Sequence, residues 1–356
     1  NSGTSLWTQV GQDIDGEAVD DEFGDSVSIS SDGTRVAIGA RGNDGNGAFA
    51  GHVRVFALAV FADGSTAWFK VGQDIDGEAA GDNFGNSVSI SSDGTRVAIG
   101  APFNDSTANL RDGHVRVYED IGGSWSKMGQ DINGGTSYNA FGRSVSISSD
   151  GTHVAIGAEG DDDGGVNAGH VRVYEWDSGT SLWTQVGQDI DGEAAGDASG
   201  RSVSMSSDGT RVAIGSPMYV SSSAAGHVRV YEWDNVSWSQ VGQNIDGEAA
   251  GDNSGYSVSI SSDGTRVAIG AHKNSNPNGN YSGHVRVYDW NSETSVWTQV
   301  GPDIDGEAYL DRFGFSVSIS PDGTHVAIGA PENDGTGGDS GHTRVYSLGA
   351  FLGTPG

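Results

Sequence analysis

The residues Ser-Asp-Gly-Thr-Arg-Val-Ala-Ile-Gly at positions 92–100 decide the fold, because close variants of this stretch occur six times along the chain. Successive copies are separated by 61, 57, 58, 55 and 59 residues, and their aspartates are Asp32, Asp93, Asp150, Asp208, Asp263 and Asp322. A fixed period of this kind is typical of propellers and solenoids, in which each repeat is one structural unit. We therefore expect residues 1–356 to form a single domain of six repeats.

Each repeat carries four stretches with the pattern of β-strands. In the second repeat, residues 87–91 alternate serine with valine and isoleucine, which is the period of a half-buried strand. A Ser-Asp-Gly-Thr turn leads into a second strand at residues 96–101, because glycine accepts the positive φ of a hairpin. Residues 113–118 and 125–129 supply a third and a fourth strand. Four antiparallel strands per repeat predict an all-β, six-bladed β-propeller.

Side-chain sizes predict how the blades stack. In the second repeat, Val88 and Ile90 point to one face of the blade, while Ser87 and Ser89 point to the other. The large face of each blade can then pack on the small face of its neighbour around a ring.

The two ends of the chain predict how the ring closes. Residues 7–10, Trp-Thr-Gln-Val, match the fourth strand of other repeats, and the last repeat supplies only three strands within residues 316–346. We therefore expect the N-terminal strand to join the C-terminal blade, which also removes exposed sheet edges.

The repeat contains Gly81-Asp-Asn-Phe-Gly85, then Ser87-Val-Ser, Ile99-Gly-Ala-Pro102 and Gly113-His-Val-Arg-Val-Tyr118. It resembles the FG-GAP repeat, the propeller repeat of integrin α-subunits and of many secreted microbial and algal proteins, over essentially the whole chain. The resemblance implies the fold strongly and the function weakly, since this scaffold hosts several roles. In integrins the calcium loop lies in the hairpin between the first two strands. Here that hairpin is only Ser-Ser-Asp-Gly-Thr, too short and too poor in carboxylates for such a cage.

Composition excludes several classes of partner and site. Acidic side chains outnumber basic ones 48 to 18, and a formal charge of −30 repels nucleic acid and anionic membranes. The absence of cysteine excludes disulfides, a thiol nucleophile and a thiolate zinc site.

A candidate calcium site precedes the first strand of five repeats. Carboxylates recur there at relative positions 1, 3, 5 and 9, and Ca2+ prefers clusters of oxygen ligands. The candidate ligands are Asp13, Asp15, Glu17 and Asp21; Asp74, Asp76, Glu78 and Asp82; Asp189, Asp191, Glu193 and Asp197; Asn244, Asp246, Glu248 and Asp252; and Asp303, Asp305, Glu307 and Asp311. The alternative is that the last aspartate accepts backbone N–H groups in a turn, while Asp-Gly-Glu shapes a solvated loop. The third repeat has lost the pattern.

Six histidines open the third strand of the repeats, at His52, His114, His170, His227, His284 and His342. Copies in different blades should lie too far apart to share one metal ion. We interpret each as hydrogen-bonded to a neighbouring blade or loop. The arginine two residues later, as at Arg116 and Arg172, should form salt bridges or stack between blades.

The sequence contains no nucleophile elbow, HExxH motif, phosphate loop or dinucleotide fingerprint. A catalytic site on a repeat scaffold needs residues that differ between the copies. The first strand, however, reads Ser-Val-Ser in all six repeats. A hydrolase or lyase on this scaffold would need a single asymmetric pocket on the ring axis. We therefore expect that the protein is not an enzyme.

The loops before the first strand and after the second strand should emerge on one face of the ring, where ligands usually bind to such scaffolds. We predict a non-enzymatic, extracellular or cell-surface propeller that acts in adhesion or structural assembly, with a protein or glycan ligand at this acidic face. A lectin-like carbohydrate-binding module is the alternative, because tryptophan and tyrosine recur in the third and fourth strands. Glycosylation sequons at Asn104, Asn235 and Asn280 favour a secreted glycoprotein.

Overall fold

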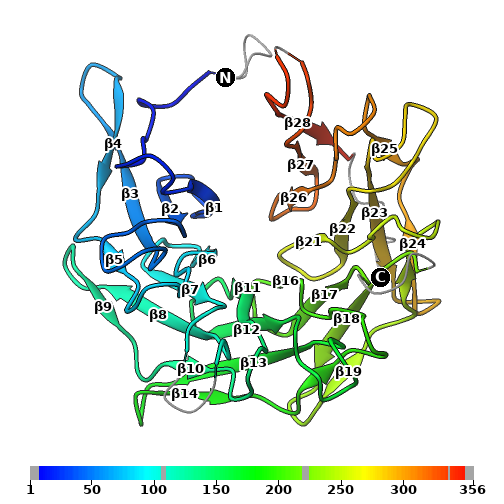
Figure 1. The fold of residues 1–356 in the computed structure, drawn as a ribbon, viewed down its shortest axis with the longest axis horizontal. Coiled ribbons are helices and arrows are strands. Elements are labelled where there is room, and N and C mark those ends of the chain that lie inside the picture. Colours follow the sequence, from blue (N-terminus) through cyan, green and yellow to red (C-terminus); the bar gives the residue numbers. More distant parts are fainter. Residues whose placement is uncertain (1–7, 106–109, 219–223, 336, 349–356) are drawn as a thin grey trace.

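The computed structural model describes residues 8–105, 110–218, 224–335 and 337–348, which form six antiparallel sheets around a central axis (Figure 1). This confirms the all-β, six-bladed propeller. The first strands of the sheets lie nearest the axis, and the later strands lie progressively farther out. The first strands are β1 (Phe23–Ile29), β6 (Ser87–Ile90), β11 (Phe141–Ile147), β16 (Ser202–Met205), β21 (Ser257–Ile260) and β26 (Ser316–Ile319).

The remaining strands follow the predicted order in each repeat. The second strands are β2 (Arg35–Ala40), β7 (Arg96–Ala101), β12 (His153–Ala158), β17 (Arg211–Ser216), β22 (Arg266–Ala271) and β27 (His325–Ala330). The third strands are β3 (His52–Val60), β8 (His114–Asp120), β13 (His170–Asp177), β18 (His227–Trp233), β23 (His284–Asn291) and β28 (His342–Ser347). The fourth strands are β4 (Thr66–Lys70), β9 (Trp125–Lys127), β14 (Leu182–Gln185), β19 (Trp238–Gln240) and β24 (Val296–Gln299).

Five blades also hold a two-residue strand that the sequence analysis missed. It comes from the acidic loop and pairs with the third strand of the blade before that loop. For example, Asp76 lies opposite His52. These strands are β5 (Ile75–Asp76), β10 (Ile132–Asn133), β15 (Ile190–Asp191), β20 (Ile245–Asp246) and β25 (Ile304–Asp305).

The hairpin between the first two strands is held by its aspartate. In the second blade, Asp93 Oδ1 accepts hydrogen bonds from the Thr95 amide at 2.9 Å, the Thr95 hydroxyl at 2.8 Å and the Ser91 hydroxyl at 2.7 Å. These bonds outweigh the opposing effect of burial and lower the pKa of Asp93. The repeated Ser-Asp-Gly-Thr motif is therefore turn chemistry and not a ligand site.

Both serines of the Ser-Val-Ser motif bond the backbone of the next blade. Ser89 Oγ accepts a hydrogen bond from the Ile147 amide at 3.1 Å, and Ser87 Oγ donates one to the Gly142 carbonyl at 2.9 Å. The same two bonds recur at all five interfaces between the described blades. This serine interlock explains why the first strand does not vary.

Glycine in the second strand allows this close approach. A Cβ atom on Gly100 would collide with the carbonyl oxygen of Gly142 in the next blade. The predicted packing of large on small faces is confirmed, because Val88 and Ile90 share a buried cluster with Ala37 and Val55 of the preceding blade. At each interface between blades, backbone atoms therefore meet near the axis, and apolar side chains pack on either side of this contact.

Five of the six strand-opening histidines are buried, with exposures of 0–6%: His52, His114, His170, His227 and His284. Burial, with a smaller effect of Arg116, lowers the pKa of His114 to about 4, so this ring is neutral at pH 7. The predicted hydrogen bond is not found at His114 Nε2, which has no partner among the described residues. The ring instead lies edge-on to Phe84, with the two ring centroids 6.3 Å apart.

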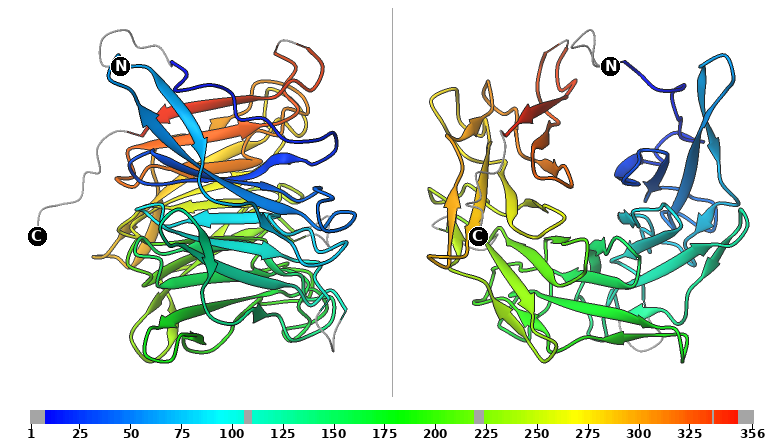
Figure 2. Two further views of the ribbon diagram at one scale, coloured as in Figure 1. Left: turned by 90° about the vertical axis from the view of Figure 1, so that its left-hand side faces the viewer. Right: turned by 180° about the vertical axis from the view of Figure 1, so that it is seen from behind.

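The predicted closure of the ring is not confirmed. Trp7 lies outside the described residues, residues 8–10 form no strand, and the last sheet contains only β26, β27 and β28. Figures 1 and 2 show the first and last blades facing each other across an opening. Val27 and Ile29 on β1 are consequently 63% and 59% exposed, although their counterparts in the second blade are buried.

Among the described residues, no helix is long and apolar enough to cross a membrane.

The serine interlock predicts a specific stability loss. Replacing Ser204→Ala leaves the Ile260 amide, which now donates to Ser204 Oγ at 3.0 Å, without its acceptor. We expect the free energy of unfolding in urea to fall by about 1–3 kcal/mol, the cost of an unsatisfied buried donor. Ser239→Ala, at an exposed site on β19, is the control and should change little. Equal values for the two variants would contradict the interlock.

Burial of His114 predicts sensitivity to acid. Its pKa is about 4 in the folded protein and near 6.5 in the unfolded chain. Between pH 4 and pH 6.5 the unfolded state therefore binds more protons, and lowering the pH shifts the equilibrium toward it. Its stabilising contribution is complete above pH 6.5, and about 2 kcal/mol of it should be lost by pH 5. His114→Gln should therefore lose less stability than the parent protein between pH 7 and pH 5, measured by urea unfolding. Parallel losses in both proteins would show that His114 is not held neutral.

Candidate active site on the ring axis

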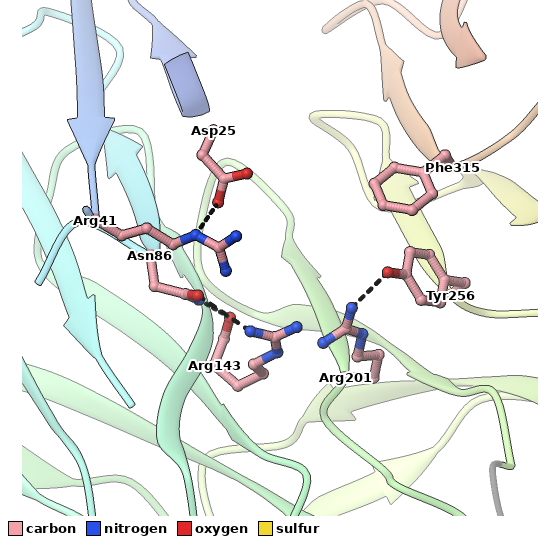
Figure 3. Close-up of a pocket in the computed structure, with 7 residues that line it drawn as sticks. All are labelled: Asp25, Arg41, Asn86, Arg143, Arg201, Tyr256 and Phe315. Atoms are coloured by element: carbon pink, nitrogen blue, oxygen red, sulfur yellow. Dashed lines mark hydrogen bonds and ion pairs between the residues drawn. The ribbon is translucent and has the colours of Figure 1, made fainter. Parts of the chain in front are cut away.

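The residue between the glycine and the Ser-Val-Ser motif differs among most repeats. These residues are Asp25, Asn86, Arg143, Arg201, Tyr256 and Phe315. Together with Arg41 they line one cavity of about 340 Å³ at the centre of the ring (Figure 3). The preceding glycine takes a positive φ, 88° at Gly142, where β11 has a bulge between Phe141 and Ser144. Such bulges redirect side chains and occur in β1 and β11, while the glycine before this residue has a positive φ in all six blades.

One side of the cavity is basic. Arg143 Nε lies 3.0 Å from Glu159 Oε1, and Arg201 Nη1 lies 3.4 Å from the same oxygen. Arg143 Nη1 also donates to Asn86 Oδ1 at 3.0 Å. Two guanidinium groups from neighbouring blades are thereby fixed around one carboxylate.

Arg41 reaches the cavity from the first blade. Its Nε atom donates to Glu22 Oε2 at 2.6 Å and lies 3.1 Å from Asp25 Oδ2. Figure 3 shows its guanidinium pointing into the space shared with Arg143 and Arg201. Three arginines from three blades therefore meet at the axis of a strongly acidic protein.

The opposite side of the cavity is aromatic. The Tyr256 hydroxyl accepts a hydrogen bond from Arg201 Nη2 at 2.6 Å, and the Arg201 guanidinium lies 4.5 Å from the centroid of the Tyr256 ring. The Tyr256 ring contacts Phe315 and His272, with centroid distances of 5.0 and 4.0 Å. Burial, reinforced by Lys273 and the nearby arginines, lowers the pKa of His272 to about 3. This imidazole therefore supports the aromatic wall as a neutral group.

Glu159 holds the two arginines together from the end of β12. Its Oε1 atom contacts both arginines, whereas its Oε2 atom is buried and has no hydrogen-bond partner among the described residues. A buried acceptor without a partner is costly unless a water molecule or a ligand satisfies it. The arginines that line the cavity can bind an anion, and Glu159 lies directly behind two of them.

Sequence reasoning missed this site by one position. It examined Ser-Val-Ser, which does not vary, and overlooked the preceding residue, which ranges from aspartate to phenylalanine. A second signal lies after the second strand, where Pro102, Pro217 and Pro331 alternate with Arg41, Glu159 and His272. Positions that vary inside an otherwise uniform repeat mark the residues that face the axis.

Among the described residues, no candidate metal cluster brings together all four predicted calcium ligands of one repeat. In the second repeat, Asp82 Oδ2 accepts hydrogen bonds from the Ala79 amide at 3.1 Å and from Asn104 Nδ2 at 3.0 Å. Glu78 instead contacts Arg116, which also binds Asp131 of the next repeat at 2.9 Å. Asp82 thus accepts hydrogen bonds in the turn, as the alternative interpretation proposed. Arg116 forms salt bridges between blades, as predicted.

Clusters that could hold a metal ion combine residues of two consecutive repeats with the strand-opening histidine. They are Glu17, His52 and Asp74; Glu78, His114 and Asp131; His170, Asp189 and Asp191; and Glu248, His284 and Asp303. Each cluster also has an arginine on one of its carboxylates, so a guanidinium already supplies positive charge there; the arginines are Arg54, Arg116, Arg172 and Arg286. Calcium in the acidic loops stays a prediction, as does an extracellular location.

One glycosylation candidate does not fit the structure. Asn104 is 7% exposed and its side-chain amide donates to Asp82, so a glycan there would break this bond and displace the loop. Asn235 and Asn280 are exposed and remain candidates.

Several solved structures share the fold. A candidate 6-phosphogluconolactonase of Bacteroides uniformis aligns with 14% identity over 91% of this chain and 80% of its own, with a TM-score of 0.60. The periplasmic gluconolactonase of Pseudomonas aeruginosa aligns with 14% identity over 91% and 88%, with a TM-score of 0.53. The hydrazine synthase of Kuenenia stuttgartiensis aligns with 13% identity over 98% of both chains, with a TM-score of 0.51. No curated protein matches the sequence.

These findings correct the prediction of a non-enzymatic adhesion or assembly protein. Two of the proteins that share the fold are named as lactonases, which are enzymes. The described residues also form an asymmetric pocket on the ring axis, which is the feature that the sequence analysis expected of an enzyme on this scaffold. The prediction was wrong because it judged symmetry from the serine positions, which serve the interlock between blades.

The FG-GAP repeat pattern matches residues 13–56, 75–118, 133–174, 245–288 and 303–346, which is more than half of the sequence. The matches cover five of the six blades and coincide with the residues that first suggested the resemblance. The chain belongs to the FG-GAP repeat family.

Proposed function

We propose that the protein is a hydrolase that opens a small anionic ester or lactone in the axial pocket. The observation that carries this proposal is the asymmetry of the pocket, which is lined by three arginines and an aromatic wall. Two of these arginines contact Glu159, whose buried Oε2 atom has no hydrogen-bond partner among the described residues. A cavity of about 340 Å³ lies in the size range of small-molecule sites. The names of the two lactonases that share the fold support the class of reaction.

The arginines favour an anionic substrate. Guanidinium groups bind carboxylate and phosphate through planar, charge-assisted hydrogen bonds. Arg143 and Arg201 are anchored by Glu159, Asn86 and Tyr256, so their positions are set before the substrate arrives. Tyr256 and Phe315 offer flat apolar surface on the other side of the cavity, where the carbon skeleton of the substrate can lie.

Hydrolysis needs a base for water and a positive charge for the oxyanion. Glu159 Oε2 would accept a proton from water as the water oxygen bonds the carbonyl carbon. The negative charge that develops on the carbonyl oxygen would lie near Arg143 and Arg201, where fixed positive groups stabilise it. Collapse of this intermediate breaks the ring C–O bond, and the leaving oxygen takes the proton back from Glu159. Water and lactone are thereby converted to the open hydroxy acid.

The test compares Glu159→Gln with a matched variant away from the axis. We expect Glu159→Gln to lower kcat by about 10²- to 10⁴-fold on δ-gluconolactone or 6-phosphogluconolactone, because the general base is lost. Glu232→Gln removes the same charge from the outer pair that Glu232 forms with Arg211, and should leave kcat unchanged. Acid release followed in a pH-stat, corrected for spontaneous hydrolysis, gives both values.

The arginine side is tested separately. Arg201→Gln should raise KM more than it lowers kcat and should affect the phosphorylated lactone more than the neutral one. Arg211→Gln, which removes a guanidinium paired with Glu232 and not part of the pocket lining, is the control. The proposal is wrong if the parent protein does not accelerate either reaction and calorimetry detects no binding of 6-phosphogluconate, the stable product.

A further inference from the structure

We infer that the Tyr256 hydroxyl binds the ring oxygen of the substrate, so that the axial pocket is suited to lactones whose leaving group is an aliphatic alkoxide. This inference rests on the proposed function and names the substrate class of the same site. It follows from three features of Tyr256. Its hydroxyl has a hydrogen without an acceptor, its ring is held in place, and it lies beside an arginine that would bind the carbonyl oxygen.

The Tyr256 hydroxyl can donate one hydrogen bond that no described residue accepts. Its oxygen accepts a hydrogen bond from Arg201 Nη2 at 2.6 Å, the contact drawn in Figure 3. A hydroxyl can donate one hydrogen bond while its oxygen accepts others, and a guanidinium offers no acceptor in return. Because Tyr256 lines the cavity, a bound ligand can supply the acceptor for this hydrogen.

Arg201 makes this hydroxyl a stronger donor. Its guanidinium lies 4.5 Å from the centroid of the Tyr256 ring and donates a short hydrogen bond to the Tyr256 oxygen. Hydrogen bonds in a chain polarise one another, so an O–H group whose oxygen accepts a bond from a cation donates more strongly. The pair is therefore suited to an acceptor that gains negative charge during a reaction.

Aromatic packing sets the position of the hydroxyl. The centroids of the His272 and Phe315 rings lie 4.0 and 5.0 Å from that of Tyr256, and 5.6 Å from each other. Phe315 occupies the position of Tyr256 in the next blade, so a phenyl ring alone is compatible with packing at this position. Of the six residues at this position of the repeat, only Tyr256 carries a hydroxyl. The hydroxyl is therefore an addition that the packing does not require.

The shape of a lactone matches this arrangement. Its carbonyl oxygen and its ring oxygen are bonded to the same carbon atom. A lactone whose carbonyl oxygen lies at Arg201 therefore brings its ring oxygen toward the hydroxyl that Arg201 already contacts. The remaining ring carbons can then lie against the aromatic side of the cavity, which Tyr256 and Phe315 form.

The ring oxygen gains charge when the lactone opens. As the tetrahedral intermediate collapses, the C–O bond breaks and its electron pair passes to the ring oxygen. A hydrogen bond from Tyr256 stabilises this charge in the transition state. The proton that the oxygen finally takes comes from Glu159 in the proposed reaction, so Tyr256 is not itself deprotonated. An aliphatic alkoxide depends strongly on such a bond, whereas a phenolate delocalises its charge over an aromatic ring and depends on it little.

The test compares two lactones that differ in leaving group. δ-Gluconolactone opens to an alkoxide, and dihydrocoumarin opens to a phenolate. We expect Tyr256→Phe to lower kcat about 10²-fold on δ-gluconolactone and less than about threefold on dihydrocoumarin, because only the alkoxide depends on the lost hydrogen bond. Acid release in a pH-stat, corrected for spontaneous hydrolysis, gives both values. The substitution keeps the ring, and urea unfolding checks that the variant is folded.

A matched control exists on β18, outside the pocket lining. Arg229 Nη1 donates to the Tyr231 hydroxyl at 2.7 Å, and the Arg229 guanidinium lies 5.5 Å from the centroid of the Tyr231 ring. Tyr231→Phe therefore breaks the same kind of arginine–tyrosine pair at a site that does not line the cavity. It should leave kcat on both lactones unchanged.

Equal losses of Tyr256→Phe on the two lactones would overturn the inference. They would show that Tyr256 only holds Arg201 in place for the carbonyl oxygen, which both substrates share. An unchanged kcat on δ-gluconolactone would overturn it as well. In both cases the parent protein still hydrolyses the lactones, so the proposed function stands. A parent protein that accelerates neither reaction contradicts the proposed function, and the inference fails with it.

Discussion

The rest of the structure depends on the serine interlock between the innermost strands. Ser87 and Ser89 bond backbone atoms of the next blade, and Gly100 leaves room for its carbonyl oxygen. These contacts use only small side chains and main chain, so they can repeat without alteration in each blade. The residue just before the first serine takes no part in them. It is therefore free to differ from blade to blade, which is how a nearly uniform scaffold can carry a site without symmetry.

This division explains which features could be predicted. The strands, the Asp93 hairpin and the packing of Val88 on its neighbour all follow from local pattern, which six copies make plain. The axial pocket does not follow, because Arg143, Arg201 and Tyr256 are separated by 58 and then 55 residues and meet only when the blades assemble. Repetition also directs attention to the residues that recur, whereas the pocket consists of those that do not.

In the acidic loops, by contrast, a regular sequence pattern did not reveal which residues contact each other. Their carboxylate spacing is regular in the sequence, yet Arg116 lies between Glu78 of its own repeat and Asp131 of the next. Arg116 lies in β8, and Asp131 belongs to the acidic loop of the next repeat. The spacing of the carboxylates alone therefore could not show that these residues form one ion-pair group with Glu78. A recurrent set of carboxylates therefore becomes a set of ion pairs between blades, and its charge is partly neutralised inside the ring.

The distribution of charge constrains how the proposed anionic substrate could bind. The net charge of −30 repels anions at long range, but at physiological salt that field is screened beyond about 8 Å. Affinity must then come from groups within a few ångströms, which in this protein means Arg41, Arg143 and Arg201. Their strength depends on exclusion of water, because the attraction between charges rises as the local dielectric falls.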